Sequence, residues 1–386
     1  MKTLRTIHVF LFCCIFVAPL PMFGHTVQVR GKVLSLDGKP FIVKGMHYGP
    51  WRPGTGPAKG YPYPSPQNVE EDFRIIRSLN VNTILVFDPP GYVLDLADRY
   101  GLTVLYSFNI NWWPQSPEAS AAERDRVLLT VRDYRDKPAI LGWVLGNEIP
   151  PNAIEQRGRG AIENGLADLY RAVKAEDPSH PITHSNWPPE KDLNLNFFDI
   201  VSFNLYPLWP PEVVALGYEN YIENVLQPIA GNKPLLITEF GANSLEATDQ
   251  GEARLIGQSW QGLRKAGACG GIVFEFADEW WKNYDNPRHA GNWWDRVPAP
   301  DDEKTHDLDP EEYYGVVGAD RTPKLAFKTV QEMFASNEGQ IFTAFRVIPG
   351  ILILLLLLLA FGAWLWARRS HAARNRQLNS SSKQLR

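Results

Sequence analysis

Eight short apolar runs, most of them separated by amphipathic segments, occupy the region between residues 41 and 278. The runs are continuously apolar, which is typical of strands that are covered on both faces. Strands that alternate with helices form parallel sheets. The simplest closed arrangement is an α/β fold, the (β/α)₈ TIM barrel, and a doubly wound open sheet is the alternative. The predicted strands are 41–47, 83–88, 103–109, 140–148, 181–186, 200–206, 234–241 and 271–278.

Two features favour the barrel over the open sheet. No Gly-rich phosphate loop follows the first run, and polar residues recur at the carboxyl ends of nearly every run. Residues 27–36 and 40–44, separated by Asp37-Gly38, predict a short N-terminal β-hairpin that leads into the first run. The predicted helices are 68–79, 93–100, 118–134, 160–176, 212–228, 252–266 and 324–335.

The N-terminal segment has the features of a secretory signal peptide. Lys2 and Arg5 precede an apolar run over residues 8–20 that is too short to span a bilayer, so we expect a signal peptide over residues 1–24. Cys269 is the only cysteine outside this segment. An exported chain with one cysteine forms no intrachain disulfide, so the apolar core must hold the fold together.

The C-terminal segment predicts a membrane anchor. Residues 347–366 are apolar apart from Pro349 and a few small residues, and about 20 such residues span the core of a bilayer. The tail at 367–386 contains six Lys and Arg residues and no acid, which predicts a cytoplasmic location. We therefore expect a single-pass membrane protein whose folded domain, residues 25–340, faces the periplasm or the cell exterior.

The distribution of charge argues against nucleic acid as a partner. The net charge of the chain is −4, but nine of its cations lie at the two ends of the chain, over residues 1–24 and 346–386, where no acid occurs. The part between these segments therefore carries a net charge of −13. Such a domain repels phosphate backbones.

Two glutamates end predicted strands in equivalent positions. Glu148 ends the fourth strand, in the sequence Gly146-Asn147-Glu148, and Glu239 lies near the end of the seventh. On its own, Gly-Asn-Glu is more often an ordinary turn. In a barrel, however, the carboxyl ends of all strands meet on one face, where active sites lie. Two carboxylates on that face are the minimum apparatus for cleaving a glycosidic bond.

The stretches Trp143-Val-Leu-Gly-Asn-Glu148 and Leu236-Ile-Thr-Glu-Phe-Gly241 resemble motifs of the clan A glycoside hydrolases. Further similarity to family 2 and to family 5-like TIM-barrel glycosidases lies at 36–45, 199–206, 270–280, 314–317 and 323–326, and the resemblance covers residues 27–335.

The resemblance implies a retaining mechanism with two catalytic glutamates. In it Glu239 is the nucleophile and Glu148 is the acid and then the base. Asn147 binds the 2-hydroxyl of the sugar and Tyr206 positions Glu239. Such a site needs a raised pKa on the acid and an ionised nucleophile.

One position departs from the pattern of the clan. Its members commonly carry an arginine on the second strand near the nucleophile, and this chain has Leu85 there. Lys44 and Arg52 are the candidates to replace that cation, which would help keep Glu239 ionised. The departure motivates a second hypothesis, a non-catalytic carbohydrate-binding receptor on the same barrel.

Aromatic residues follow several predicted strands. Flat apolar rings suit the C–H faces of sugars, whereas Trp143 and Trp260 fall at core positions. The predicted substrate-binding residues are His47, Asn147, Asn204, Tyr206, Trp112, Trp113, Trp187 and Trp280, and Trp209 belongs to the same aromatic group.

The histidines show no ligand spacing, so we expect no metal and no cofactor. The sequence thus predicts a membrane-anchored retaining β-glycosidase or β-glycanase that acts on a β-linked oligo- or polysaccharide. A β-glucan transglycosylase, in which a sugar replaces water as the acceptor, is a close alternative.

Overall fold

The computed structural model describes residues 25–52, 55–57, 61–113, 115–279 and 310–335. The predicted signal peptide (1–24), Trp280, the transmembrane helix (347–366) and the basic tail (367–386) all lie outside these residues. Within the described ranges no helix has the length and apolar character that crossing a membrane requires.

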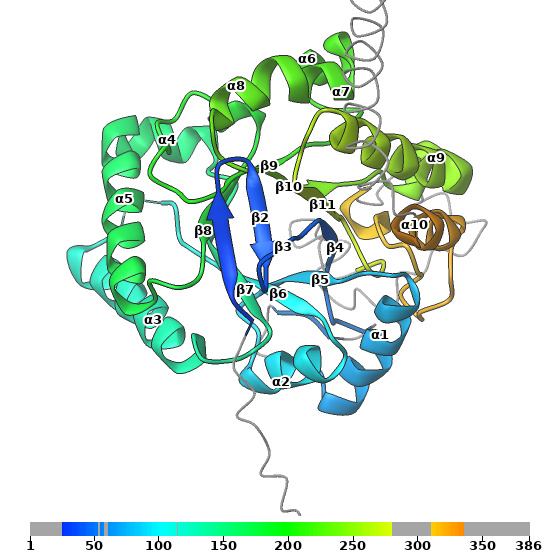
Figure 1. Cartoon of the computed structure of the whole chain (residues 1–386), viewed down its shortest axis with the longest axis horizontal. Helices are drawn as coiled ribbons and strands as arrows, with labels where there is room; N and C mark the ends of the chain where they lie inside the picture. Colours follow the sequence, from blue (N-terminus) through cyan, green and yellow to red (C-terminus); the bar gives the residue numbers. More distant parts are fainter. Residues whose placement is uncertain (1–24, 53–54, 58–60, 114, 280–309, 336–386) are drawn as a thin grey trace, which may run out of the picture.

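Eight parallel strands close into a barrel, as Figure 1 shows. They follow one another around it in the order β10-β11-β4-β5-β6-β7-β8-β9, and β9 pairs with β10 to complete the closure. The predicted TIM barrel is confirmed and the open sheet is excluded. The strands are β4 (Val43–His47), β5 (Thr83–Phe87), β6 (Thr103–Phe108), β7 (Ile140–Asn147), β8 (Ile182–Asn186), β9 (Val201–Asn204), β10 (Leu235–Phe240) and β11 (Gly270–Val273).

Helices surround the barrel (Figure 1). They are α1 (Pro66–Ser78), α2 (Gly91–Arg99), α3 (Pro117–Tyr134), α4 (Pro151–Arg157), α5 (Arg159–Glu176), α6 (Pro211–Leu216), α7 (Tyr218–Tyr221), α8 (Gln227–Ala230), α9 (Ser244–Lys265) and α10 (Leu325–Ala335). Shorter helical turns are η2 (Pro188–Glu190), η3 (Ile222–Leu226) and η6 (Pro310–Tyr313).

Local sequence explains where helix α1 begins and which face it buries. The hydroxyl of Ser65 accepts a hydrogen bond from the backbone N–H of Asn68, and Pro66 occupies the first turn, where its missing N–H costs nothing. Val69, Phe73 and Ile76 follow at helical spacing and are buried against the barrel.

Several predicted elements differ from the structure. The single helix expected over 212–228 is divided after α6, because Gly217 has a φ of +81°, and the chain then continues through α7, η3 and α8 without a gap. The last predicted strand, 271–278, pairs in the barrel only over Gly270–Val273. Beyond Val273 single backbone hydrogen bonds continue, from Phe274 to Phe240 and from Phe276 to His47, while Glu275 and Asp278 bond to Tyr314 and Val317.

A three-stranded antiparallel sheet precedes the barrel and consists of β1 (Val27–Arg30), β2 (Val33–Leu36) and β3 (Lys39–Pro40). The expected N-terminal hairpin therefore exists, but its predicted boundaries are wrong. Gly31 has a φ of +56°, so the chain reverses in the middle of the predicted strand 27–36. Residues 43–44 belong to barrel strand β4 instead.

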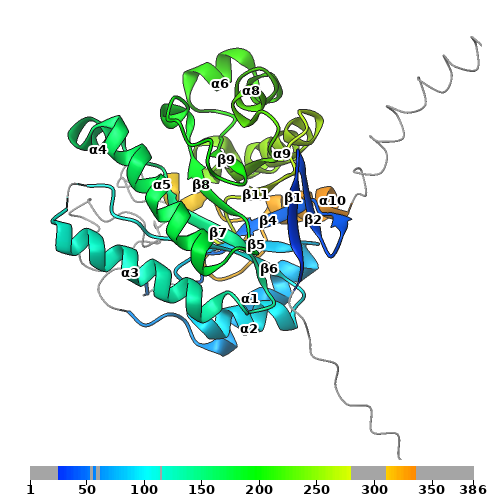
Figure 2. The same ribbon diagram turned by 60° about the vertical axis from the view of Figure 1, so that its left-hand side comes forward.

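This small sheet closes one end of the barrel (Figures 1 and 2). Val27 and Leu34 pack against Val43, Leu236 and Ile272 in one apolar cluster. Val43 is the first residue of β4, so the covered end is the amino-terminal end of the strands. The polar residues lie at the opposite end of the barrel, at the carboxyl ends of the strands.

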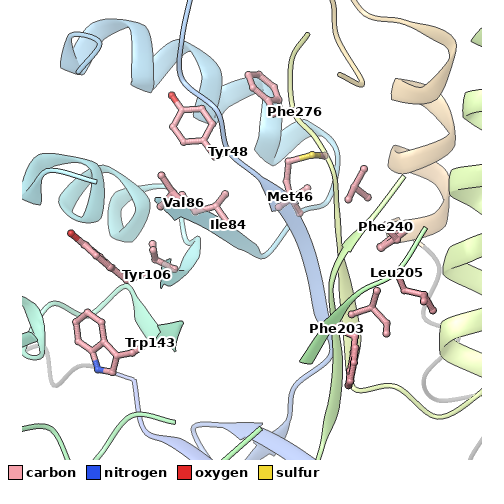
Figure 3. Packing of buried hydrophobic residues seen from close by; sticks show 14 of the residues in the cluster. Met46, Tyr48, Ile84, Val86, Tyr106, Trp143, Phe203, Leu205, Phe240 and Phe276 are labelled. Carbon is pink, nitrogen blue, oxygen red and sulfur yellow. The ribbon is translucent and has the colours of Figure 1, made fainter. Parts of the chain in front are cut away.

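The main core lies between the barrel strands and the helices. Figure 3 shows Met46, Ile84, Val86, Tyr106 and Trp143 in this layer, and all five are buried. The core position expected for Trp143 is confirmed, and its indole N–H donates to Asp177 Oδ2 at 2.8 Å. Trp260, which is 4% exposed, is likewise a core residue.

Candidate active site

The carboxyl ends of the strands surround a cavity of about 530 Å³. Glu148, which follows β7, and Glu239, on β10, both line it. Because β8 and β9 lie between these two strands, the two acids approach the cavity from different parts of the rim. His47, Trp51, Phe87, Asn147, Tyr206 and Phe274 are among the other lining residues.

The end of β7 turns sharply before Glu148. Gly146 has a φ of +82°, and a Cβ atom at this position would lie 2.2 Å from the ring of Trp112. Only glycine fits both the conformation and the space. The indole N–H of Trp112 donates to the backbone oxygen of Asn147 at 2.8 Å, which holds the turn in place.

The environment of Glu148 suits a residue that carries a proton. Burial raises the pKa of Glu148 to about 7. The hydrogen bond from Asn204 lowers this pKa, and the nearby Glu190 carboxylate raises it further. The side-chain amide of Asn204 donates to Glu148 Oε1 at 2.8 Å. A carboxyl group with a pKa near neutrality is suited to act as both general acid and general base.

Asn204 fixes Glu148 through a network that joins three strands. Its amide nitrogen also donates to Asn147 Oδ1 at 3.0 Å, and its oxygen accepts from the hydroxyl of Thr238 at 2.8 Å. Asn204 is 1% exposed and is not among the described residues that line the cavity. The structure thus shows Asn204 bonded to Glu148, and its predicted sugar contact stays a prediction.

Tyr206 and Glu239 are brought together, as the family resemblance implies. The hydroxyl of Tyr206 donates to Glu239 Oε2 at 2.7 Å. Burial raises the pKa of Tyr206 well above its usual value, with a further contribution from Glu239, so the hydroxyl keeps its proton. Glu239 is 6% exposed and opens on the same cavity as Glu148.

The two candidates to replace the expected arginine have other partners. Lys44 donates to the backbone oxygen of Phe334, and Arg52 pairs with Asp72 at 3.0 Å. Leu85 points into the barrel and packs in the apolar cluster that contains Val43 and Ile272. An aliphatic side chain in the interior of the barrel thus takes the place of the expected arginine.

His47 and Asn147, both expected to bind substrate, line the cavity. The ring of His47 packs against Phe87 and Phe274, with centroids 5.5 and 4.9 Å away, and its Nδ1 lies 3.6 Å from Glu275 Oε2. These contacts hold the imidazole at the floor of the cavity.

The tryptophans predicted to bind substrate lie in different environments. Trp112 is 9% exposed, contacts the ring of His184 and does not line the cavity that holds the two glutamates, so its predicted sugar contact stays a prediction. Trp113 is 40% exposed on the connection after β6. Trp187 stacks on Trp209 outside the cavity. Trp280 lies outside the described residues.

Sequence reasoning missed the aromatic wall that the connection after β4 provides. Trp51, Tyr61 and Tyr63 all line the cavity. The signal was present, since these residues follow the first predicted strand just as the other tryptophans follow later ones.

A buried ion pair holds this connection. Arg321 donates through Nε and a terminal nitrogen to the two oxygens of Asp72, each at 3.0 Å, and also to the backbone oxygens of Pro50 and Trp51. The side chains of Arg321 and Asp72 are 6% and 0% exposed. The planar guanidinium thus ties the aromatic wall to α1.

In the part of the chain that the structure describes, no group of three or more His, Cys, Asp or Glu side chains is arranged to hold a metal ion. Among the described residues, the carboxyl groups of Asp88, Glu148, Glu239, Glu279 and Glu311 line the cavity, together with amide, hydroxyl and imidazole groups.

Comparison with known proteins gives the same architecture. A family 2 β-galacturonidase from Eisenbergiella tayi bound to galacturonate is 21% identical with a TM-score of 0.63, and the match covers 80% of this chain and 54% of that one. A β-glucuronidase from Ruminococcus gnavus in complex with uronic deoxynojirimycin is 16% identical with a TM-score of 0.59, covering 80% and 52%.

A β-D-glucuronidase from Dictyoglomus thermophilum is 19% identical with a TM-score of 0.61, covering 81% of this chain and 54% of that one. The chain thus spans about half the length of these proteins, and the similarity concerns the fold. Residues 27–338 match the TIM barrel domain of the glycosyl hydrolases family 2. The match covers most of the sequence, and the chain belongs to this family.

Proposed function

We propose that this protein is a retaining glycoside hydrolase that cleaves β-linked glycans with Glu239 as nucleophile and Glu148 as acid and base. The observation that carries the proposal is that both carboxyl groups open on one cavity in different environments. Glu148 has a pKa raised to about 7, whereas Glu239 accepts a hydrogen bond from Tyr206. A pair of carboxyl groups with distinct environments is what a double displacement requires.

In the first step the Glu239 carboxylate attacks the anomeric carbon, and the bond from that carbon to the glycosidic oxygen breaks. The proton of Glu148 passes to the departing oxygen, which leaves as a hydroxyl group. The products are a glycosyl ester on Glu239 and an ionised Glu148.

In the second step the ionised Glu148 takes a proton from water while the water oxygen attacks the anomeric carbon. The ester bond breaks, and Glu239 returns as a carboxylate. The free sugar keeps the β configuration because two inversions have occurred. Where a sugar hydroxyl replaces water in this step, the same site performs transglycosylation.

The test uses the full chain with panels of β-glycosyl fluorides, aryl β-glycosides and β-linked oligosaccharides. We expect hydrolysis by the wild-type protein, at least a thousandfold loss in Glu239→Gln, and covalent labelling of Glu239 by a fluorosugar inactivator, detected by mass spectrometry. Wild-type activity no higher than that of Glu239→Gln on every substrate would refute the proposal.

One observation favours a second candidate, a non-catalytic carbohydrate-binding receptor. Leu85 occupies the place of the cation that clan members use near the nucleophile, and Lys44 and Arg52 bind elsewhere. Saturable binding of an oligosaccharide without labelling of Glu239 supports the receptor, whereas labelling excludes it.

We also propose that residues 347–366 anchor the protein in a membrane, with the barrel in the periplasm or outside the cell and the basic tail in the cytoplasm. The length, apolar composition and flanking cations of this segment support the proposal. The full chain is then expected in the membrane fraction after carbonate extraction. Recovery in the soluble fraction would refute anchoring and leave the catalytic proposal unaffected.

A further inference from the structure

Two stacked tryptophans form an exposed surface beside the cavity. The rings of Trp187 and Trp209 lie 5.3 Å apart between centroids with an angle of 25° between their planes. Trp209 is 43% exposed, and its neighbour Leu208 is 57% exposed. We call Trp187 and Trp209 the tryptophan platform. Exposed apolar side chains that gather at the rim of a polar cavity mark a binding surface.

The platform is tied to the neighbours of both catalytic glutamates. The indole N–H of Trp187 donates to the backbone oxygen of Ile149, the residue after Glu148, at 3.2 Å. The backbone N–H of Trp209 donates to the oxygen of Tyr206 at 3.4 Å, and Tyr206 in turn binds Glu239. The platform is therefore fixed through hydrogen bonds to the residue after Glu148 and to the tyrosine that binds Glu239.

The order of the strands places the platform on one side of the cavity. Trp187 follows β8 and Trp209 follows β9, whereas the aromatic wall of the cavity comes from the connection after β4 and from Phe87 on β5. In the closed barrel β4 and β5 lie across from β8 and β9. A glycan whose cleaved sugar occupies the cavity would extend past Glu148 toward the platform.

The proposed role of Glu148 defines which end of the glycan lies near the platform. Glu148 protonates the glycosidic oxygen, so the sugars that depart lie on its side of the broken bond. Because Trp187 is held by the residue that follows Glu148, the platform adjoins the departing sugars.

We propose that the tryptophan platform is a binding subsite for the leaving-group sugars of a β-linked oligosaccharide or polysaccharide. This inference rests on the proposed function for its direction along the glycan. The indole N–H of Trp187 already has a backbone partner, so the rings offer apolar faces, which match the C–H faces of pyranose sugars. The same surface would hold an acceptor sugar in transglycosylation.

The test compares two substrates that share the same cleaved sugar. One is a β-linked trisaccharide and the other the corresponding β-glycosyl fluoride, whose leaving group is too small to reach the platform. In Trp209→Ala we expect the ratio of kcat/KM for the trisaccharide to that for the fluoride to fall about tenfold, which corresponds to about 1.4 kcal/mol. Leu129→Ala, which removes an exposed apolar side chain from α3, is the matched control and should keep the ratio.

A binding measurement separates this inference from the proposed function. Calorimetry on the Glu239→Gln variant, with gluco-, manno-, galacto- and xylo-oligosaccharides of increasing length, needs no turnover. We expect Trp209→Ala in that background to weaken the best oligosaccharide about tenfold.

A ratio and a binding constant that both stay within about twofold overturn the subsite, as does the absence of binding to every oligosaccharide. Loss of binding in Trp209→Ala with no wild-type turnover supports the platform as a glycan site and refutes the catalytic proposal alone.

Discussion

The imidazole of His184 and the carboxylate of Glu190 form a buried pair beneath Glu148, with Nε2 and Oε2 2.9 Å apart. The other oxygen of Glu190 accepts from the backbone N–H of Ile149, and His184 Nδ1 donates to the oxygen of Leu145 at 2.9 Å. The pair thus holds the chain on both sides of Glu148. A buried network whose polar atoms are satisfied in this way is rigid.

Removing Glu190 is therefore expected to destabilise the barrel. Glu190→Ala leaves His184 and the N–H of Ile149 without their partner, and we expect the free energy of unfolding to fall by about 3–5 kcal/mol in chemical denaturation. Glu190→Gln keeps two polar atoms in place and should cost less. A loss of under about 1 kcal/mol in Glu190→Ala would show that the pair does not hold this strand end.

The raised pKa of Glu148 predicts the pH dependence of catalysis. The first step needs Glu148 protonated, and its pKa is raised to about 7, so kcat/KM for oligosaccharides should fall as the pH rises through about 7. Glu148→Gln should lose this decline and be about a hundredfold slower or more. The same decline should be weak for glycosyl fluorides, whose leaving group needs no proton. Its persistence in Glu148→Gln would assign the pKa to another group.

Asn204→Ala should move that decline to higher pH. The hydrogen bond from Asn204 lowers the pKa of Glu148, so its loss raises the pKa further. We expect kcat/KM at neutral pH to fall about tenfold as well, because Glu148 loses its fixed orientation.

Asn186→Ala is the matched control for this variant. Asn186 is also a buried asparagine at a strand end, but its amide donates to backbone oxygens of His184 and Ser202. An equal shift of the pH profile in both variants would contradict the role assigned to Asn204.

The barrel and its two glutamates were predictable because they depend on local patterns. Apolar runs identify the strands, and the carboxyl ends of parallel strands always meet on one face. The packing of individual rings was less accessible. Whether Trp112 opens on the cavity or packs inward depends on the space next to Gly146. That space is free for the ring because residue 146 has no Cβ atom and adopts a positive φ.

Residues that meet across the chain were beyond sequence reasoning. The aromatic wall around Trp51 depends on the bond from Arg321 to Asp72, two residues 249 positions apart. Nothing in the local sequence of either residue indicates its partner. Asn204 was found as a strand-end residue, but the direction of its side chain follows from Thr238 on the next strand.

The hydrogen bonds of Arg321 to Asp72, Pro50 and Trp51, which we call the Arg321 clamp, lead to a last prediction. Arg321→Lys keeps the charge but cannot bind both oxygens of Asp72 and the backbone of Trp51 together. We expect the free energy of unfolding to fall by about 2–4 kcal/mol and KM to rise about tenfold for fluorides and oligosaccharides alike, since Trp51 lines the cavity that holds the cleaved sugar.

Arg74→Lys, at an exposed arginine of α1, is the control for both measurements. A variant of Arg321 that loses stability while its KM stays at the wild-type value would show that the clamp supports the barrel without shaping the cavity. A tenfold rise confined to oligosaccharides would instead place its effect on the leaving-group side, which the position of Trp51 argues against.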